Sequence, residues 1–143
     1  MFFANYVLLV EGPTDVGLRN RLLDDGHVVL PAGTYFLNCI GKLNIHRFMS
    51  LLGAVAVTHS VLHDDDDKID WHVEANQLIA DSSNAYTVGI SLMPGYLEKY
   101  LGLPAAGAPH RKPQHVMYNN ADGEVDEVRL SEFCKLTRSC VCE

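Results

Sequence analysis

Residues 6–15 of this 143-residue chain read Tyr-Val-Leu-Leu-Val-Glu-Gly-Pro-Thr-Asp. The stretch begins as a run of large apolar residues and ends in a carboxylate, a glycine, a proline and a second carboxylate. An apolar run of this length, followed at once by turn residues, is typical of a buried parallel strand. Gly12-Pro13 predicts a turn, after which a helix is expected to begin at Thr14 or Asp15, because proline is tolerated in a first helical turn. Glu11 is therefore expected at the carboxyl end of a central strand, where open α/β sheets bind their ligands.

The chain then alternates between helical and extended patterns. We expect a helix over residues 14–23 with Gly26 after its end, two strand segments at 28–30 and 35–39, and a helix over 44–52. Five apolar residues are expected on the buried face of this second helix: Ile45, Phe48, Met49, Leu51 and Leu52. Residues 54–63 form the next strand-like stretch. The order strand, helix, strand, helix, strand predicts an α/β fold with a central, mainly parallel sheet flanked by helices.

Four aspartates, Asp64 to Asp67, follow this second buried strand directly. If the two strands are neighbours, Glu11 faces the aspartates across a short gap, and carboxylates that converge in this way require cations between them. Alternate side chains on an extended segment point the same way, so Asp64 and Asp66 could bind one ion together. Oxygen ligands suit Mg²⁺, Mn²⁺ or Ca²⁺. The alternative is a solvated acidic loop, with Glu11 and Asp15 merely ending the strand and capping the helix.

The second half of the chain has a less regular pattern. We expect a helix over residues 69–80, a strand over 86–92, a short helix ending at Leu101, and two closing helices over 114–119 and 128–136. Between them, residues 102–113 are expected to form a flexible loop. It carries a locally basic cluster suited to phosphate contacts, which consists of His110, Arg111 and Lys112.

Composition narrows the class of protein further. With 48% hydrophobic residues the chain can fold as a single domain, which we expect to span residues 1–143, with a core over about 5–92 and a C-terminal helical extension. The net charge of -7 gives no broad basic surface for nucleic acid, although carboxylates at a metal site would lower this number. No apolar run has the length of a membrane span, so we expect a cytoplasmic protein.

The four cysteines, Cys39, Cys134, Cys140 and Cys142, are expected to be free thiols, with a zinc site or a tail disulfide as alternatives.

The two acidic motifs, Glu11-Gly-Pro-Thr-Asp15 and His63-Asp-Asp-Asp66, resemble those of the Toprim domain, the metal-binding unit of topoisomerases, bacterial primases and several nucleases. Residues 2–15 are similar to the entry to the Toprim domain of OLD (overcoming lysogenisation defect) proteins, in which an ABC-type ATPase precedes a Toprim endonuclease. The resemblance covers the first seventy residues and extends more loosely to about Asn120. It implies a Rossmann-like Toprim fold.

The resemblance also implies roles for particular residues. Glu11 matches the Toprim glutamate, and Asp64 and Asp66 match its Asp-x-Asp metal ligands. Asp15 stands where OLD nucleases carry a second acid, commonly a glutamate. Further along, Glu98 lies in a segment that resembles the helix bringing another acid to the site, and Lys112 lies in one that resembles the family's lysine segment.

These residues together suggest two-metal chemistry. Two divalent ions about 4 Å apart activate a water, position the scissile phosphate and stabilise the leaving oxygen. Glu11, Asp15, Asp64, Asp66 and Glu98 would supply oxygen ligands, and Lys112 would stabilise charge on the phosphate or protonate the leaving group. The expected ions are Mg²⁺, with Mn²⁺ or Ca²⁺ as substitutes.

The resemblance implies a metal-dependent endonuclease acting on DNA. The sequence contains no phosphate-binding loop of the form G-x-x-x-x-G-K-[ST], so an ATPase domain is expected as a partner, in cis or in trans. Two alternatives stay open: a small stand-alone nuclease acting on structured RNA, and a non-catalytic Toprim module that binds a partner ATPase. A homodimer is compatible with either.

Overall fold

Four parallel strands form the central sheet of the computed structural model, which describes residues 5–65, 70–104 and 106–141. The strands lie in the order β2-β1-β3-β4. They are β1 (Tyr6–Val10), β2 (Thr34–Asn38), β3 (His59–Asp64) and β4 (Thr87–Met93). The predicted α/β class is confirmed, and the two strands that precede the acidic residues are neighbours, because β1 pairs directly with β3.

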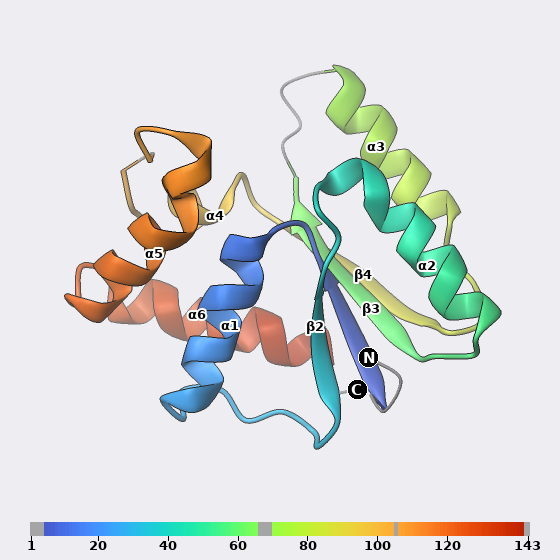
Figure 1. Ribbon diagram of the computed structural model, residues 1–143, viewed down its shortest axis with the longest axis horizontal. Helices are drawn as coiled ribbons and strands as arrows, with labels where there is room; N and C mark the ends of the chain where they lie inside the picture. The colour runs from blue at the N-terminus through green and yellow to red at the C-terminus, as the bar shows by residue number, and fades with distance from the viewer. Residues whose placement is uncertain (1–4, 66–69, 105, 142–143) are drawn as a thin grey trace.

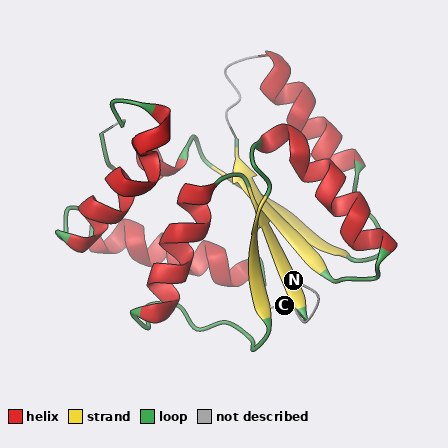
Figure 2. Cartoon of the chain, viewed as in Figure 1, coloured by secondary structure: helices red, strands yellow, loops and turns green. Residues whose placement is uncertain are grey.

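Helices cover both faces of this sheet (Figures 1 and 2). One face carries α1 (Pro13–Asp24), the short α4 (Leu97–Tyr100), α5 (Lys112–Ala121) and α6 (Glu127–Ser139). The other carries α2 (Ile45–Ala54) and α3 (Asp70–Asp81). Single turns of 3₁₀ helix, η1 (Lys42–Asn44) and η2 (Pro109–Arg111), precede α2 and α5. No described helix is long and apolar enough to cross a membrane.

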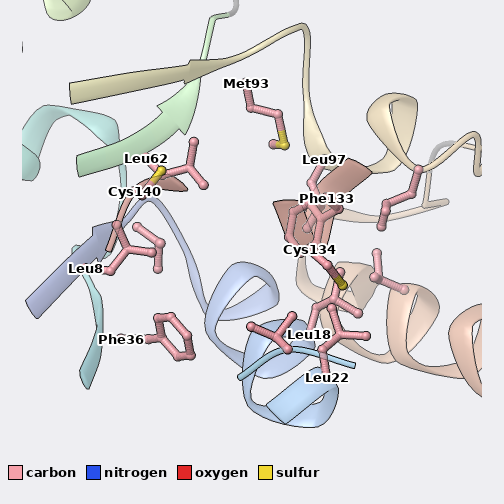
Figure 3. Packing of buried hydrophobic residues seen from close by; sticks show 14 of the residues in the cluster. Leu8, Leu18, Leu22, Phe36, Leu62, Met93, Leu97, Phe133, Cys134 and Cys140 are labelled. Carbon is pink, nitrogen blue, oxygen red and sulfur yellow. The ribbon is translucent and has the colours of Figure 1, made fainter. Parts of the chain in front are cut away.

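Alternate residues of β1 belong to two hydrophobic cores. Leu8 and Val10 face the α1, α5 and α6 side, whereas Val7 and Leu9 face the α2 and α3 side. On the first side, Phe133 and Cys134 of α6 lie near the apolar residues of α1, as Figure 3 shows. The C-terminal helices therefore complete the core over which the first strand lies.

The other predicted helices and strands are found, with differences in extent, but residues 28–30 are not a strand. The Val28 N–H donates to Leu22 O (3.2 Å) at the end of α1 and not to a neighbouring strand. The strand predicted over 54–63 begins only at His59, because α2 continues to Ala54 and Ala56 turns the chain with φ 55°.

Two side-chain and loop predictions are also corrected. Leu51 is 48% exposed and does not belong to the buried face of α2. The loop predicted over residues 102–113 is shorter, because Pro109–Arg111 forms η2 and Lys112 begins α5. Three cysteines are buried free thiols, Cys39, Cys134 and Cys140, whereas Cys142 lies outside the described residues.

Candidate functional site

A cavity of about 230 Å³ opens where the carboxyl ends of β1 and β3 meet the N-termini of α1, α4 and α5. It contains six of the eight residues singled out from the sequence: Glu11, Asp15, Asp64, Glu98, His110 and Lys112. Arg111 lines a neighbouring groove instead. Asp66 lies outside the described residues. The remaining wall consists of Gly12, Pro13, Thr14, Leu97 and Pro113.

Glu11 and Asp64 reach the cavity from the ends of adjacent strands. The Glu11 carbonyl accepts a hydrogen bond from the Gly41 N–H at 2.8 Å, which ties the end of β1 to the turn after β2. The Asp65 N–H donates to Met93 O at 2.9 Å, which ties the end of β3 to β4. Both carboxylates are therefore carried on backbone that is fixed by the sheet, and both residues are half-buried.

Asp15 is held by a buried arginine that the sequence reasoning missed. The Arg19 Nη1 donates to Asp15 Oδ1 at 2.9 Å and to the Asp15 carbonyl at 3.1 Å. Arg19 is 1% exposed, and its guanidinium lies 4.5 Å from the centre of the Phe133 ring. Asp15 therefore does not cap α1, whose N-cap is Gly12 and has no side-chain cap hydrogen bond. The spacing of four residues was a visible signal, but such pairs usually lie on exposed helix surfaces.

Glu98 and Lys112 form an ion pair inside the cavity. Glu98 is 2% exposed, and its Oε1 lies 3.2 Å from Lys112 Nζ. The lysine side chain remains 44% exposed, and its Nζ lies 5.9 Å from the centre of the Tyr96 ring. Glu98 is therefore buried, and Lys112 combines a buried partner with access to solvent.

Lys42 is a second buried cation at this edge of the sheet that the sequence reasoning did not single out. It is 3% exposed, and its Nζ donates to the Asp65 carbonyl at 3.4 Å. The same carbonyl accepts a hydrogen bond from Asn76 Nδ2 at 2.9 Å. Two side chains from different elements thus hold the backbone immediately after Asp64. A lysine directly after a glycine at the end of a strand was the signal available in the sequence.

Cys39 directly follows β2, and the pKa of its thiol is affected by the carboxylates at this end of the sheet. Burial raises the pKa of the Cys39 thiol to about 12, and the charges of Glu11 and Asp15 act in the same direction, against a backbone hydrogen bond with Val10. Its thiol is therefore protonated at neutral pH, which makes it a poor nucleophile and a poor metal ligand.

The oxygen atoms that line the cavity are of the chemical type that binds hard divalent cations. Four carboxylates line the cavity, from Glu11, Asp15, Asp64 and Glu98, and oxygen ligands of this kind suit Mg²⁺ or Mn²⁺. Within residues 5–65, 70–104 and 106–141, however, no three acidic, histidine or cysteine side chains are gathered closely enough to form a complete metal centre. Two of the four carboxylates are paired with Arg19 and Lys112 instead.

The fold and the cavity define a class: an α/β domain with a parallel sheet and a carboxylate-lined cavity at the carboxyl ends of its inner strands. Residues 2–66 match the family model described as "Overcoming lysogenization defect protein-like, TOPRIM domain". This match confirms the resemblance to an OLD-type Toprim domain over the part of the chain that contains both acidic motifs.

The whole chain is also similar in fold to a solved structure, the C-terminal region of the Xanthomonas campestris pv. campestris OLD protein. The TM-score is 0.52 at 17% sequence identity, over 94% of this chain and 81% of that one. This similarity supports the Toprim Rossmann-like fold. A comparison with curated proteins finds no match.

Proposed function

We propose that this chain is an OLD-type Toprim module that hydrolyses phosphodiester bonds in DNA as a divalent-metal-dependent endonuclease. The observation that carries the proposal is the shared cavity. Glu11 directly follows β1, Asp64 ends β3 and Glu98 lies in α4, and the three line one cavity together with Lys112. A carboxylate cluster with an adjacent lysine is suited to binding cations and a phosphate at the same point.

The chain's own residues would divide the work. Glu11, Asp15, Asp64 and Glu98 would hold the ions, together with Asp66, and Arg19 would orient the Asp15 carboxylate. When bound, two Mg²⁺ ions, or Mn²⁺ or Ca²⁺ in their place, supply an activated water and stabilise the leaving oxygen. Lys112 would contact a non-bridging phosphate oxygen, because its ammonium group is partly exposed at the mouth of the cavity.

We also propose that the module acts with an ATPase domain, in cis or in trans. The family match is to a domain of the OLD type, and the solved structure with the similar fold is the C-terminal region of an OLD protein. Because this chain contains no phosphate-binding loop, the ATPase would have to lie elsewhere.

The ion pairs favour one other candidate, a non-catalytic module that binds a partner ATPase. Arg19 and Lys112 neutralise Asp15 and Glu98 without any metal, so the cavity could be stable as a purely structural feature. The two candidates differ in what the carboxylates of Glu11 and Asp64 are needed for: catalysis in the first, and at most stability in the second.

Nicking of supercoiled plasmid DNA in Mg²⁺ or Mn²⁺ tests the proposal. We expect Glu11→Gln and Asp64→Asn to reduce nicking at least a hundredfold while the circular dichroism spectrum stays unchanged. Glu74→Gln, on the exposed surface of α3, is the matched control and should keep full activity. Cleavage confined to folded RNA would overturn the choice of DNA. Absence of cleavage in either metal, with a purified partner ATPase present, would favour the non-catalytic module.

A further inference from the structure

A second, open groove of about 730 Å³ lies beside the carboxylate cavity. It runs along α5 and is lined by Ala106, Gly107, His110, Arg111, Gln114, His115 and Tyr118. His110 lines both hollows, so the groove and the cavity adjoin at this residue. A ligand bound across the carboxylates could therefore continue into the groove without leaving the protein surface.

The side chains along the groove follow helical spacing. Gln114, His115 and Tyr118 lie three, four and seven residues after Arg111, the N-cap of α5, so the four residues form one stripe that begins at the start of this helix. The stripe is about 10 Å long at about 1.5 Å per residue, which is the length of about three stacked bases at about 3.4 Å each. The Nε2 of His115 lies 2.9 Å from Pro104 O, so this histidine fixes the adjacent loop as a wall.

The charges in the groove change along its length. Arg111, at the end near the cavity, is exposed and has no ion pair within the described ranges. Of the described lining residues none is acidic, although the chain as a whole has a net charge of -7. Beyond the far end, the Asp122 carboxylate raises the pKa of the Tyr118 phenol, and the charge of Glu124 acts in the same direction. A phosphate chain would therefore be attracted at the Arg111 end and repelled beyond Tyr118.

Tyr118 presents an aromatic surface at the point where this repulsion begins. The residue is 67% exposed, so its ring is accessible to a ligand. A base can stack on such a ring only when it is unpaired, because the bases of a duplex are covered by their neighbours. The arrangement of a cation, an amide and an exposed ring is thus suited to a short single strand.

We propose that the groove along α5 binds a single-stranded DNA segment of about three nucleotides that is continuous with the strand in the carboxylate cavity, with Arg111 on a phosphate and Tyr118 stacked on a base. This inference rests on the proposed function for the choice of DNA and for the presence of a strand in the carboxylate cavity. It adds a preference for substrates with an unpaired segment beside the cut site.

Binding measured without cleavage tests the groove independently of catalysis. The full chain is titrated in EDTA against a fluorescein-labelled oligothymidylate and against a blunt duplex, with fluorescence anisotropy as the readout. We expect Tyr118→Ala to raise the Kd for the single strand at least fivefold, Tyr118→Phe to stay within twofold, and duplex binding to be unchanged. Tyr35→Ala, an exposed tyrosine on the edge strand β2, is the control and should have no effect.

Several results would overturn the inference. These are a wild-type chain that does not prefer the single strand, a Tyr118→Ala variant that binds it within twofold of wild type, and a Tyr35→Ala variant that loses as much affinity. Tyr118-dependent binding seen only with an oligouridylate would overturn the choice of DNA. Because no metal is present, loss of nicking in the plasmid assay leaves these outcomes readable, so failure of the groove and failure of the proposed function are distinguishable.

Discussion

Arg19 shows how one side chain can link the candidate site to the core. Its guanidinium donates to Asp15 on the cavity side and lies over the Phe133 ring on the core side. Two of its nitrogens, Nε and Nη2, have no hydrogen-bond partner among the described residues. A buried charge in this position costs free energy unless it is paired, so Arg19 and Asp15 depend on each other.

Removing this arginine should therefore destabilise the protein strongly. We expect Arg19→Met to lower the free energy of unfolding by about 3 kcal/mol or more, because a buried carboxylate loses its partner. Arg21→Met is the matched control on the same helix: Arg21 pairs with Asp25 but its side chain is 51% exposed, so the loss should stay below about 1 kcal/mol. Urea unfolding measures both. Equal losses of unfolding free energy in the two variants would show that the buried Arg19 ion pair contributes no more to stability than the exposed Arg21 pair.

The raised pKa of the Cys39 thiol predicts that the stability of the folded protein depends on pH. Its pKa is raised from 9.0 to about 12 in the folded protein, so the folded state holds the thiol proton more tightly than the unfolded chain does. The resulting stabilisation is complete below pH 9 and is lost as the pH rises from 9 towards 12. In thermal unfolding, Cys39→Ala should show a shallower decline over this window than wild type. Parallel declines for the two proteins would contradict the assignment.

At the scale of elements, the turn between β2 and η1 is strained at the point where it passes the site. Ile40 has φ 56°, a left-handed conformation that is rare for a β-branched residue, and Gly41 follows with φ 106° and ψ 152°. This turn brings the Gly41 N–H to the Glu11 carbonyl and Lys42 to the Asp65 carbonyl. The strained conformation thus serves to connect the ends of β1, β2 and β3.

Substitutions at Ile40 and at Gly41 should change the free energy of unfolding in opposite directions. Ile40→Gly should raise the free energy of unfolding by about 0.5–1 kcal/mol, because it relieves about 1–2 kcal/mol of left-handed strain and loses less than that in chain entropy. Ile40 is 76% exposed, so little buried surface is lost. Gly41→Ala should lower stability by about 1–3 kcal/mol, because its conformation is essentially confined to glycine. Chemical denaturation checks both, and a destabilised Ile40→Gly protein would rule out strain at this turn.

The elements that could be predicted are those with an unambiguous local pattern. The run before Glu11 predicted β1, and the glycine after residue 25 predicted the end of α1. The strand predictions for residues 28–30 and 54–58 were wrong, because a short apolar segment is compatible with both a strand and a helix end. Only the hydrogen-bond partner of the segment decides between the two. The cavity residues Glu11 and Asp64 followed from parallel topology, whereas Arg19 and Lys42 did not, because burial of a cation depends on packing between elements that are distant in sequence.

At the scale of the whole molecule, the C-terminal helices pack against one face of the sheet and form part of the hydrophobic core. The Tyr6 hydroxyl donates to the Cys140 carbonyl at 2.9 Å, which joins the first strand to the end of α6. Phe133 is fully buried in the same cluster as Leu8 and Leu18. We therefore propose that residues 1–143 fold as a single unit.

Truncation tests this proposal. Deleting residues 127–143 should leave a chain without a cooperative unfolding transition, because it removes Phe133 from the core and from its contact with Arg19. A calorimetric scan of the truncated chain provides the measurement. Cooperative melting near the wild-type Tm would show instead that α6 is an appendage.

The proposed function requires that the cavity carboxylates bind divalent cations together. Titration of the full chain with Mn²⁺, followed by electron paramagnetic resonance of the free ion, measures this directly. We expect saturable binding that weakens at least tenfold in both Glu11→Gln and Asp64→Asn, and that is unchanged in Glu74→Gln. Folded variants that bind Mn²⁺ as wild type does, or a wild-type chain that binds none, would contradict it.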